Sequence, residues 1–452
     1  MPQLFGTDGI RGKANHYPMT PEVALKAGRA LVKTLSDGKK AKNVLIGKDT
    51  RISGDMLECA IAAGICSAGA DAHVCGVLPT PGVAYLAAAE SMDAGVVISA
   101  SHNPYADNGI KIFNSSGFKL PMEIEASIDR MIQDADPDMF MSHNNSIGRV
   151  QPRPMLEDQY MAFLIQTLPK GRPLSGLKVV LDCSNGATYR AAPYVFESLG
   201  ARVTTICAEP DGKNINQGCG SQDTSKLKQM VLETGAAIGL AFDGDGDRLI
   251  AVDETGRNAT GDQILAICAK YSKEAGKLAN NRVVSTVMSN VGFHKAMAAL
   301  GIELIVTDVG DRYVLEQMQA QGAVIGGEDS GHMIFLDQHT SGDGMITGLR
   351  LIQVMLETGK PLSELSSIMA VYPQVLMNVE IREKQDIYQI PEIKQVISAI
   401  EQKLGHQGRV LVRYSGTQPL CRVMVEGPDA DQTQQYCTEI VDVIQAKIGI
   451  GD

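Results

Sequence analysis

The chain has 452 residues, of which 44% are hydrophobic, and it carries a net charge of −11 at pH 7. Its length allows three or four domains of ordinary size. The acidic balance argues against broad binding to nucleic acid or to anionic membranes, so an anionic ligand would need a local basic cluster. The sequence has no basic start followed by an apolar run and no stretch apolar enough to span a bilayer, which predicts a cytoplasmic protein.

Short β-rich runs alternate with Ala-rich helical stretches, a pattern typical of α/β layering. The first unit reads strand, helix, strand, helix, strand, at residues 44–47, 55–68, 72–77, from Pro81 onward, and 95–100. Further strands of the same kind are expected at residues 178–182, 238–242 and 282–286. One supersecondary plan is therefore used several times, although the segments are too divergent to form a sequence repeat.

Polar and turn-rich stretches divide the chain into four predicted domains. Residues 134–154 are polar and contain three prolines, residues 253–261 are rich in turn formers, and Tyr372-Pro373 precedes the last segment. That segment reads strand, helix, strand, strand, helix, which indicates a small α+β domain. The predicted domains cover residues 1–150, 151–255, 256–370 and 371–452.

The cysteines are scattered, odd in number and never spaced as CxxC. This usage is typical of small core residues in a reducing compartment, and it predicts neither a zinc site nor a disulfide framework. The nine residues are Cys59, Cys66, Cys75, Cys183, Cys207, Cys219, Cys268, Cys421 and Cys437.

An acidic loop, Asp-Gly-Asp-Gly-Asp at residues 243–247, directly follows the apolar strand at 238–242. Alternate positions of an extended chain face one way, so Asp243, Asp245 and Asp247 can converge. Three adjacent carboxylates repel unless a cation neutralises them, and an all-oxygen site suits a hard divalent metal ion. An EF-hand is disfavoured because a strand follows the loop. A strand followed by DxD also resembles haloacid-dehalogenase-type phosphatases, which use the first Asp of this motif as the nucleophile. In that alternative, Asp243 would be the nucleophile of this chain.

A second polar loop, SASHNP at residues 99–104, follows the strand at 96–98. It is either a capped turn or a reactive loop in which Ser101 carries a phosphate beside His102. No GxSxG elbow occurs, which disfavours acyl-transfer chemistry. Lys111 lies in the apolar run IKIF, where burial could lower its pKa toward general-base function, although a lone lysine is more often a surface residue.

Three further loops combine glycine with polar or basic side chains. The loop at residues 6–12 (GTDGIRG) contributes Arg11, unless it is a simple turn with a solvated arginine. The loop at 327–332 (GEDSGH) offers Glu328 and Ser330 for hydrogen bonds to sugar hydroxyls, with His332 either structural or titrating. The loop at 413–419 (RYSGTQP) can form an anion nest, to which Arg422 adds charge, or it can be only a hairpin connection.

These five loops, in this order, resemble the signature loops of the α-D-phosphohexomutase family, and the match spans residues 6–425. The resemblance implies three similar α/β domains with mixed sheets flanked by helices, plus a smaller C-terminal α+β domain, around a central cleft. It also implies that Ser101 is carried as phosphoserine. One Mg²⁺ per chain would be held by Asp243, Asp245, Asp247 and an oxygen of phospho-Ser101.

The resemblance implies roles for the remaining loop residues as well. Arg11, Lys111 and His102 would surround the transferring phosphoryl group, and Lys111 would be the acid or base. Other side chains would bind the sugar hydroxyls or the phosphate that is not being transferred. These are Glu328, Ser330 and His332 for the sugar, and Arg413, Ser415, Gly416, Thr417 and Arg422 for the phosphate.

Two segments, residues 98–113 and 214–221, favour family members that interconvert glucosamine 6-phosphate and glucosamine 1-phosphate through a hexosamine 1,6-bisphosphate. Mannose or glucose phosphates are the alternative substrates within the family, and a Mg²⁺-dependent phosphatase is the alternative outside it. The product would feed amino-sugar and peptidoglycan precursor synthesis in a monomer or homodimer. Gln418, Asp329 and Asp308 depart from the usual family residues and could tune substrate choice.

Overall fold

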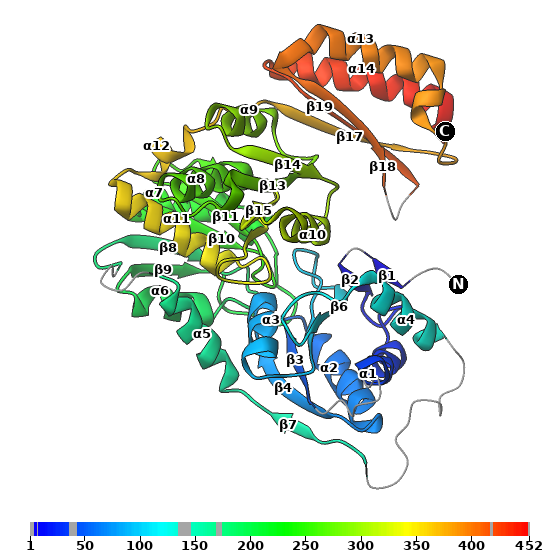
Figure 1. Ribbon diagram of the computed structural model, residues 1–452, viewed down its shortest axis with the longest axis vertical. Coiled ribbons are helices and arrows are strands. Elements are labelled where there is room, and N and C mark those ends of the chain that lie inside the picture. Colours follow the sequence, from blue (N-terminus) through cyan, green and yellow to red (C-terminus); the bar gives the residue numbers. More distant parts are fainter. Residues whose placement is uncertain are drawn as a thin grey trace. The chain divides into compact units, whose positions relative to one another are not determined.

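The computed structural model describes residues 4–6, 8–35, 43–133, 146–168, 174–415 and 419–450. The chain forms two compact units, shown in Figure 1. The first unit comprises Met1–Val287 and Glu303–Ser367, and the second comprises Met288–Ile302 and Ile368–Asp452. Within the described residues, no helix is both long and apolar enough to cross a bilayer.

The first sheet of the larger unit is mixed, with the strand order β1-β2-β6-β5-β3-β4-β7. Strands β3, β4, β5 and β7 are parallel to one another, whereas β1, β2 and β6 pair antiparallel. The strands are β1 (Phe5–Gly6), β2 (Gly9–Lys13), β3 (Asn43–Lys48), β4 (Asp71–Val77), β5 (Ala94–Ile98), β6 (Asp107–Asn114) and β7 (Val150–Pro152). The helices of this region are α1 (Pro21–Leu35), α2 (Gly54–Ser67), α3 (Thr80–Ala89), α4 (Met122–Gln133) and α5 (Leu156–Gln166).

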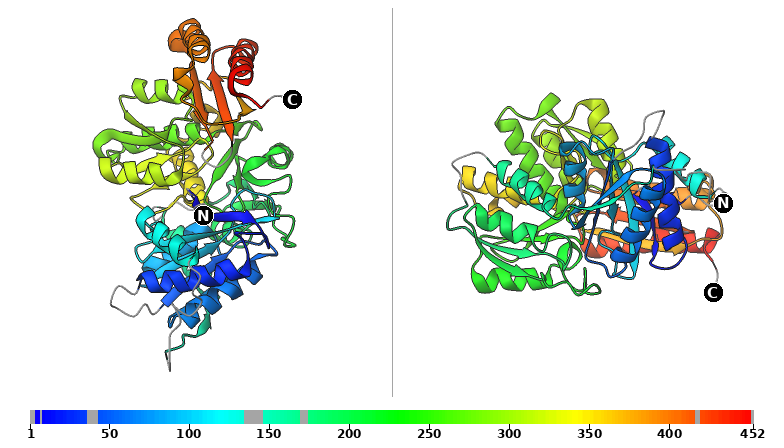
Figure 2. Two further views of the ribbon diagram at one scale, coloured as in Figure 1. Left: turned by 90° about the vertical axis from the view of Figure 1, so that its right-hand side faces the viewer. Right: turned by 90° about the horizontal axis from the view of Figure 1, so that it is seen from below.

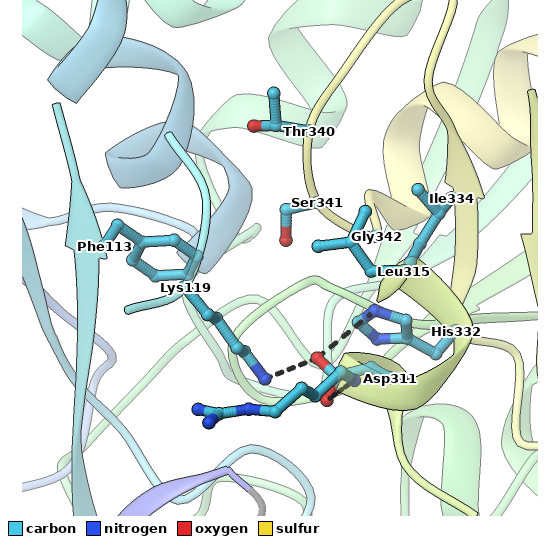
Figure 3. Close-up of a pocket in the computed structure, with 10 residues that line it drawn as sticks. Phe113, Lys119, Asp311, Leu315, His332, Ile334, Thr340, Ser341 and Gly342 are labelled. Atoms are coloured by element: carbon cyan, nitrogen blue, oxygen red, sulfur yellow. Dashed lines mark hydrogen bonds and ion pairs between the residues drawn. The ribbon is translucent and has the colours of Figure 1, made fainter. Parts of the chain in front are cut away.

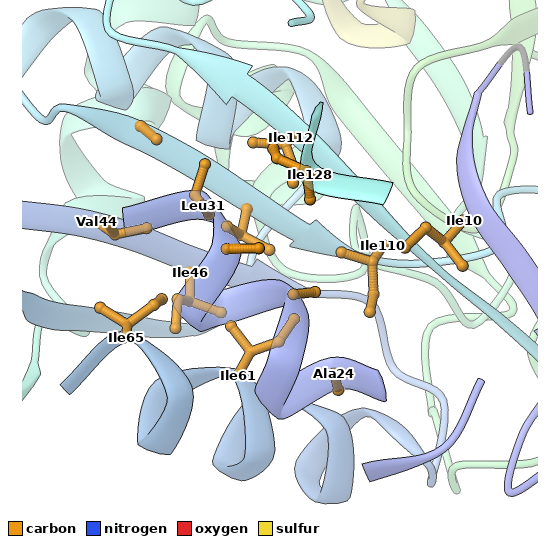
Figure 4. Packing of buried hydrophobic residues seen from close by; sticks show 14 of the residues in the cluster. Ile10, Ala24, Leu31, Val44, Ile46, Ile61, Ile65, Ile110, Ile112 and Ile128 are labelled. Carbon is orange, nitrogen blue, oxygen red and sulfur yellow. The ribbon is translucent and has the colours of Figure 1, made fainter. Parts of the chain in front are cut away.

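The core of this region lies between the first sheet and helices α1, α2 and α4, as Figure 4 shows. Alternate residues of β3, such as Val44 and Ile46, point toward these helices and pack against Leu31 and Ile61. A strand presents every second side chain to one face, so the intervening residues of β3 face the other side, where α3 packs. The amphipathic sequence of α1 fits this position, since its buried residues recur at helical spacing.

The second and third sheets follow the same plan in shorter form. Their strand orders are β12-β11-β10-β8-β9 and β14-β13-β15-β16. The second contains β8 (Lys178–Asp182), β9 (Arg202–Ile206), β10 (Ile238–Phe242), β11 (Leu249–Asp253) and β12 (Asn258–Ala259). The third contains β13 (Arg282–Thr286), β14 (Glu303–Thr307), β15 (Ile325–Gly327) and β16 (Met333–Phe335). Their helices are α6 (Ala191–Ser198), α7 (Ser225–Thr234), α8 (Gly261–Glu274), α10 (Asp311–Gln321), α11 (Gly344–Thr358) and α12 (Leu362–Ser366).

One four-strand arrangement recurs in all three sheets, as β4-β3-β5-β6, β9-β8-β10-β11 and β14-β13-β15-β16. In each, the first three strands are parallel and the last is antiparallel. The polar loops at residues 99–104, 243–248 and 328–332 all connect the third strand of this arrangement to the fourth. The prediction of three similar α/β domains with mixed sheets is therefore confirmed, and topology places three motif loops at equivalent positions.

The smaller unit is an α+β domain with one antiparallel sheet of order β17-β19-β18. Helices α13 and α14 pack on each other and on this sheet, as Figures 1 and 2 show. The elements run β17 (Gln374–Glu380), α13 (Pro391–Leu404), β18 (Arg409–Tyr414), β19 (Leu420–Glu426) and α14 (Ala430–Ile448), which is the predicted order. Helix α9 (Val291–Ala299) also belongs to this unit, where Asn290 Nδ2 donates to Glu426 Oε1 at 3.1 Å.

The expected strands at residues 178–182, 238–242 and 282–286 coincide with β8, β10 and β13. The strand expected at 95–100 ends earlier, at Ile98. Beyond Ile98, the chain turns at Ser101, whose φ of 53° is incompatible with an extended strand.

Candidate active site

Ser101 lies in the β5–β6 loop in a left-handed backbone conformation, with φ of 53°. Its backbone N–H donates to Ser99 Oγ at 2.9 Å, and Ser99 Oγ donates to Asp49 Oδ2 at 2.6 Å. Its carbonyl oxygen accepts from Arg51 Nη2 at 2.8 Å and from Asn216 Nδ2 at 2.9 Å. A positive φ is costly for a residue other than glycine, so these contacts hold Ser101 in place at a local cost.

The Ser101 hydroxyl points at the acidic loop that follows β10. Its Oγ donates to Asp243 Oδ2 at 2.6 Å, and the Ser101 side chain is buried. Gly244 makes this approach possible, because a Cβ at that position would lie 2.6 Å from the Ser101 carbonyl oxygen. The two loops follow strands of different sheets in the larger unit, so they are distant in the sequence and are brought together by the tertiary fold.

The three aspartates of the acidic loop converge as predicted from their alternation. Oxygen atoms of Asp243, Asp245 and Asp247 lie within 4.8 Å of one another, and all three residues are buried. Burial, together with the charges of Asp247 and Asp245, raises the pKa of Asp243 well above its usual range. Asp245 Oδ1 and Asp247 Oδ1 are buried without a hydrogen-bond partner in the described part of the chain. Buried, unpartnered carboxylate oxygens fit a hard divalent cation.

Lys111, on β6, is fully buried beside these carboxylates. Its Nζ lies 2.9 Å from Asp245 Oδ2, 3.1 Å from Asp8 Oδ2 and 3.5 Å from Asp247 Oδ2. Burial alone would lower the pKa of Lys111, but Asp245, Asp8 and Asp247 outweigh burial and raise it well above its usual range. The expectation of a lowered pKa for Lys111 is therefore wrong in its net direction, because the sequence does not show that three carboxylates surround the ammonium group.

His102 and Arg11 also lie beside this centre. His102 Nδ1 is 3.4 Å from Ser101 Oγ. Burial and the charges of Arg248 and Arg11 lower the pKa of His102 to about 4. Arg11 Nη2 forms an ion pair with Asp8 Oδ2, and Arg248 Nε lies 3.8 Å from Asp247 Oδ1.

An ion-pair chain extends from this centre to the loop after β15. Figure 3 shows its members Lys119, Asp311 and His332. Lys119 Nζ lies 2.5 Å from Asp8 Oδ1 and also pairs with Asp311. His332 Nε2 lies 3.7 Å from Asp311 Oδ2, and its Nδ1 lies 3.6 Å from Asp247 Oδ2. Burial lowers the pKa of His332, but Asp247, Asp311 and Glu328 outweigh burial and raise it. His332 therefore connects the acidic loop to the β15–β16 loop.

The β15–β16 loop also places Glu328 and Ser330 near the acidic loop. Arg248 and His332 form an isolated antiparallel bridge, and Leu249 N donates to Gly331 O at 3.0 Å. Glu328 Oε1 accepts from Gly310 N at 3.1 Å. Ser330 Oγ is buried and makes no hydrogen bond within the described residues.

The predicted phosphate loop lies in the smaller unit, between β18 and β19. Arg413 and Arg422 face each other in the register of this antiparallel pair. Ser415 N donates to Leu420 O at 2.8 Å, and Lys384 Nζ donates to Ser415 O at 2.6 Å. Gly416, Thr417 and Gln418 lie outside the described residues.

Sequence models of the phosphoglucomutase/phosphomannomutase family match almost the whole chain. Alpha/beta/alpha domain I matches residues 2–139, domain II 158–256, domain III 260–372, and the C-terminal domain 376–443. A phosphoglucosamine mutase of Syntrophus aciditrophicus is 54% identical over 449 residues, which cover 99% of this chain and 100% of the relative. The chain belongs to this family.

Further relatives and solved structures are similar to this chain over nearly its full length. A phosphoglucosamine mutase of Syntrophobacter fumaroxidans is 53% identical, over 99% of this chain and 100% of the relative. A crystal structure of a phosphoglucomutase/phosphomannomutase family protein from Burkholderia thailandensis has the same fold, with a TM-score of 0.80 at 23% identity over 99% of both chains. The N-acetylphosphoglucosamine mutase of Aspergillus fumigatus, solved with GlcNAc-6P and magnesium, has a TM-score of 0.72 at 16% identity over 99% of this chain and 96% of that one. Membership of this phosphohexomutase family makes the chain an isomerase, as the motifs predict.

Three charged residues of the centre were missed by the sequence analysis. Asp8 lies inside the GTDGIRG motif and contacts Lys111, so the motif itself contained a signal. Asp311 lies three residues after Asp308, which was noted as a departure from the family. Lys119 gives no local signal, because its partners Asp8 and Asp311 are distant in the sequence.

Proposed function

We propose that the chain interconverts glucosamine 6-phosphate and glucosamine 1-phosphate through phospho-Ser101 and a 1,6-bisphosphate intermediate. The observation that carries the mechanism is the 2.6 Å contact between Ser101 Oγ and Asp243 Oδ2. This contact joins the predicted phosphate carrier to the predicted metal loop. The choice of glucosamine is supported by relatives named phosphoglucosamine mutase that are about half identical over nearly the full chain.

We propose that Asp243, Asp245 and Asp247 hold one Mg²⁺ together with an oxygen of phospho-Ser101. The all-oxygen donor set and the unpartnered oxygens of Asp245 and Asp247 support this assignment. When bound, the cation would offset the negative charge of the phosphoryl group and of the three carboxylates.

The reaction begins with phospho-Ser101 and a hexosamine monophosphate. The bond from phosphorus to Ser101 Oγ breaks as a bond forms to the free sugar hydroxyl, which loses its proton. The bisphosphate then reorients in the site, so that its other phosphoryl group faces Ser101. This phosphoryl group is transferred to Ser101 Oγ. Two transfers therefore regenerate phospho-Ser101 and convert one monophosphate into the other without net hydrolysis.

Basic side chains around Ser101 support both transfers. Lys111 and Arg11 provide positive charge fixed by the neighbouring carboxylates, which suits electrostatic stabilisation of a transferring phosphoryl group. His102 Nδ1, 3.4 Å from Ser101 Oγ, is placed to pass a proton to or from the reacting oxygens. These roles of Lys111, Arg11 and His102 are assigned from their positions.

We assign substrate recognition to the two remaining loops. Glu328, Ser330 and His332 would bind sugar hydroxyls, and the orphan hydroxyl of Ser330 suits a ligand partner. Arg413, Ser415, Gly416, Thr417 and Arg422 would bind the phosphate that stays on the sugar. We also propose four domains, with edges near residues 150, 255 and 370, in a cytoplasmic monomer or homodimer. In that setting, the product would supply peptidoglycan precursor synthesis.

The substrate assignment is tested by a direct comparison of rates. With Mg²⁺ and the matching 1,6-bisphosphate, the chain should act on glucosamine 6-phosphate much faster than on the 6-phosphates of glucose or mannose. Faster turnover of glucose or mannose 6-phosphate would make the chain a different phosphohexomutase and overturn the choice of glucosamine. The phosphoserine role is tested separately by the Ser101→Ala variant, which should lose nearly all turnover, with Ser115→Ala, an exposed serine, as the matched control.

The phosphatase alternative, with Asp243 as nucleophile, is not favoured by the family relationship. Mass spectrometry separates the two mechanisms. An acid-stable phosphate on Ser101 supports the mutase, whereas a hydroxylamine-labile phosphate on Asp243 contradicts it.

A further inference from the structure

A second cluster of metal-ligating side chains lies in the larger unit, and the proposed reaction does not use it. It consists of Asp182 at the end of β8, Cys207 directly after β9, and Cys219 in the loop before residues 220–222. Strands β8 and β9 are parallel neighbours, with Asp182 paired to Ile206, so Cys207 emerges beside Asp182. The chain then returns at Cys219 to complete the group.

The donor atoms of this cluster converge. One carboxylate oxygen of Asp182 and the Sγ atoms of Cys207 and Cys219 all lie within 4.8 Å of one another. Asp182 and Cys219 are fully buried, and Cys207 is half-buried. The cluster is therefore closed on two sides and reachable from solvent at Cys207.

Backbone groups hold the Asp182 carboxylate in place. Ser184 N donates to its Oδ1 and Gly220 N donates to its Oδ2, each at 2.9 Å. Hydrogen bonds of this kind orient ligating carboxylates in metal sites and leave lone pairs for the ion.

The two thiols are arranged as a pair. The Cys219 and Cys207 thiols are in hydrogen-bonding contact with each other. Cys207 adopts a φ of 50°, a left-handed conformation that costs energy in a residue other than glycine. It occurs at the residue whose thiol joins the cluster and whose carbonyl oxygen accepts from Asn185 N at 2.6 Å.

We propose that Asp182, Cys207 and Cys219 form a binding site for one thiophilic divalent cation such as Zn²⁺, with water at the fourth position. Two thiolates and one carboxylate are a donor set for a borderline or soft ion, whereas the three aspartates of the acidic loop suit a hard ion. The larger unit would then hold two cations that do not compete for the same ligands. Neither cysteine lies in a CxxC motif, which explains why cysteine spacing predicts no such site.

Occupancy would affect the loop that supports Ser101. Cys207 and Cys219 of the cluster lie at the two ends of residues 207–219, and Asn216 lies between these two cysteines in the sequence. Asn216 Nδ2 donates to the carbonyl oxygens of Ser101 and Asn103, at 2.9 and 3.1 Å. A bound cation would therefore restrict the loop on which the Ser101 backbone depends, without contacting the substrate.

Metal titration of the reduced full-length protein tests the site. The protein is reduced with a phosphine, freed of metal on a chelating resin, and titrated with Cd²⁺ in excess Mg²⁺, which competes for the all-oxygen site. The expected result is one Cd²⁺ per chain, with the ultraviolet charge-transfer absorption of cadmium–thiolate bonds. Prior loading with Zn²⁺ should raise the Cd²⁺ concentration that is needed for this absorption, because both ions would use the same ligands.

Variants and a protection measurement distinguish this site from stray thiols. Cys207→Ser should weaken Cd²⁺ binding and lower the absorption at saturation, because one of the two cadmium–thiolate bonds is lost, whereas Cys59→Ser, which changes an exposed cysteine elsewhere, should change neither. In the unmodified protein, Cd²⁺ should slow hydrogen exchange in residues 207–219, a readout independent of how any variant folds. Absence of stoichiometric thiolate absorption in the reduced protein would overturn the proposal, including the case in which the two cysteines form a disulfide instead. An unchanged Cd²⁺ affinity together with an undiminished absorption in Cys207→Ser would overturn it as well.

Discussion

Arg413 and Arg422 lie directly opposite each other on β18 and β19, so two like charges share one face of an antiparallel pair. Opposed like charges destabilise a sheet unless an anion lies between them. Arg422 Nε is buried without a hydrogen-bond partner among the residues described, and Lys384 contacts the same loop through the Ser415 carbonyl oxygen. In a chain of net charge −11, this is the kind of local basic cluster that an anionic ligand requires.

Replacing Arg413 with alanine should mainly weaken substrate binding. A hydrogen bond to a charged group is worth about 1.5–3 kcal/mol, so the half-saturating substrate concentration should rise roughly 10- to 100-fold. Steady-state kinetics measure this rise, and Arg413→Lys should recover only part of the loss because a lysine lacks the bidentate fork. Lys394→Ala, which removes an exposed charge from α13, is the matched control. An unchanged concentration dependence in Arg413→Ala would exclude the phosphate role.

How far the site could be predicted depended on whether its signals were local in the sequence. The alternation of Asp243, Asp245 and Asp247 is a local signal, and the structure brings their oxygens together. The repeated strand plan was visible for the same reason, since apolar runs and turns mark each unit. The contact between Ser101 and Asp243 was expected only from the family resemblance, because the two residues come from different sheets.

Charge pairs between residues that are distant in the sequence could not be predicted from local sequence patterns. The apolar strand left open whether Lys111 is buried or at the surface, and the structure buries it. The direction of its pKa shift depends on Asp8, Asp245 and Asp247, which belong to other segments. Lys119 was missed for the same reason. Electrostatic environments are set by tertiary contacts, and a sequence motif shows only those that lie within a few residues.

Magnesium should both activate the protein and stabilise it through the acidic loop. Removing divalent cations with EDTA should abolish turnover, and adding Mg²⁺ at about 100 times its dissociation constant should stabilise the fold by about 2.7 kcal/mol. The gain is measured as a rise in Tm. Asp245→Asn should lose the Mg²⁺-dependent rise, whereas Asp158→Asn, an exposed acid on α5, should keep it. A rise of equal size in Asp245→Asn would show that the cation binds elsewhere.

Lys119 should couple the loop that contains Asp8 to helix α10. It pairs with Asp8 and Asp311, so Lys119→Met would leave two carboxylates facing each other. Removing one partner from a buried ion pair costs about 3–5 kcal/mol when the other charge is left unpaired. Asp8 keeps Arg11 and Lys111, and Asp311 keeps His332, so denaturant unfolding should show a loss below that range. Asp311→Asn should relieve part of that cost when combined with Lys119→Met, giving a coupling energy of about 0.5–3 kcal/mol. Strict additivity would argue against the pairing, and Lys360→Met, which breaks an exposed pair with Glu364 of α12, should cost less than about 1 kcal/mol.

The Asp343 carboxyl group predicts a pH dependence of stability. Asp343 is the N-cap of α11, where its Oδ1 accepts from Met345 N at 2.8 Å, and Tyr160 Oη donates to its Oδ2 at 2.6 Å. Burial nevertheless raises the pKa of Asp343 to about 6, and the hydrogen bonds from Tyr160 and the helix only partly oppose this. The folded state therefore binds the proton more tightly than the unfolded state does.

Replacing Asp343 with asparagine should make the protein more stable near neutral pH but not in acid. Because the folded pKa is raised, the stability that protonated Asp343 contributes is present below the unfolded pKa of 3.8 and is lost as the pH rises through about 6. The free energy of unfolding of Asp343→Asn relative to that of wild type should thus increase from pH 4 to pH 7, by roughly 2 kcal/mol. Asparagine is an equally good N-cap, so α11 keeps its start. Denaturant unfolding at each pH measures this difference, and a difference that stays constant or shrinks with rising pH contradicts the raised pKa.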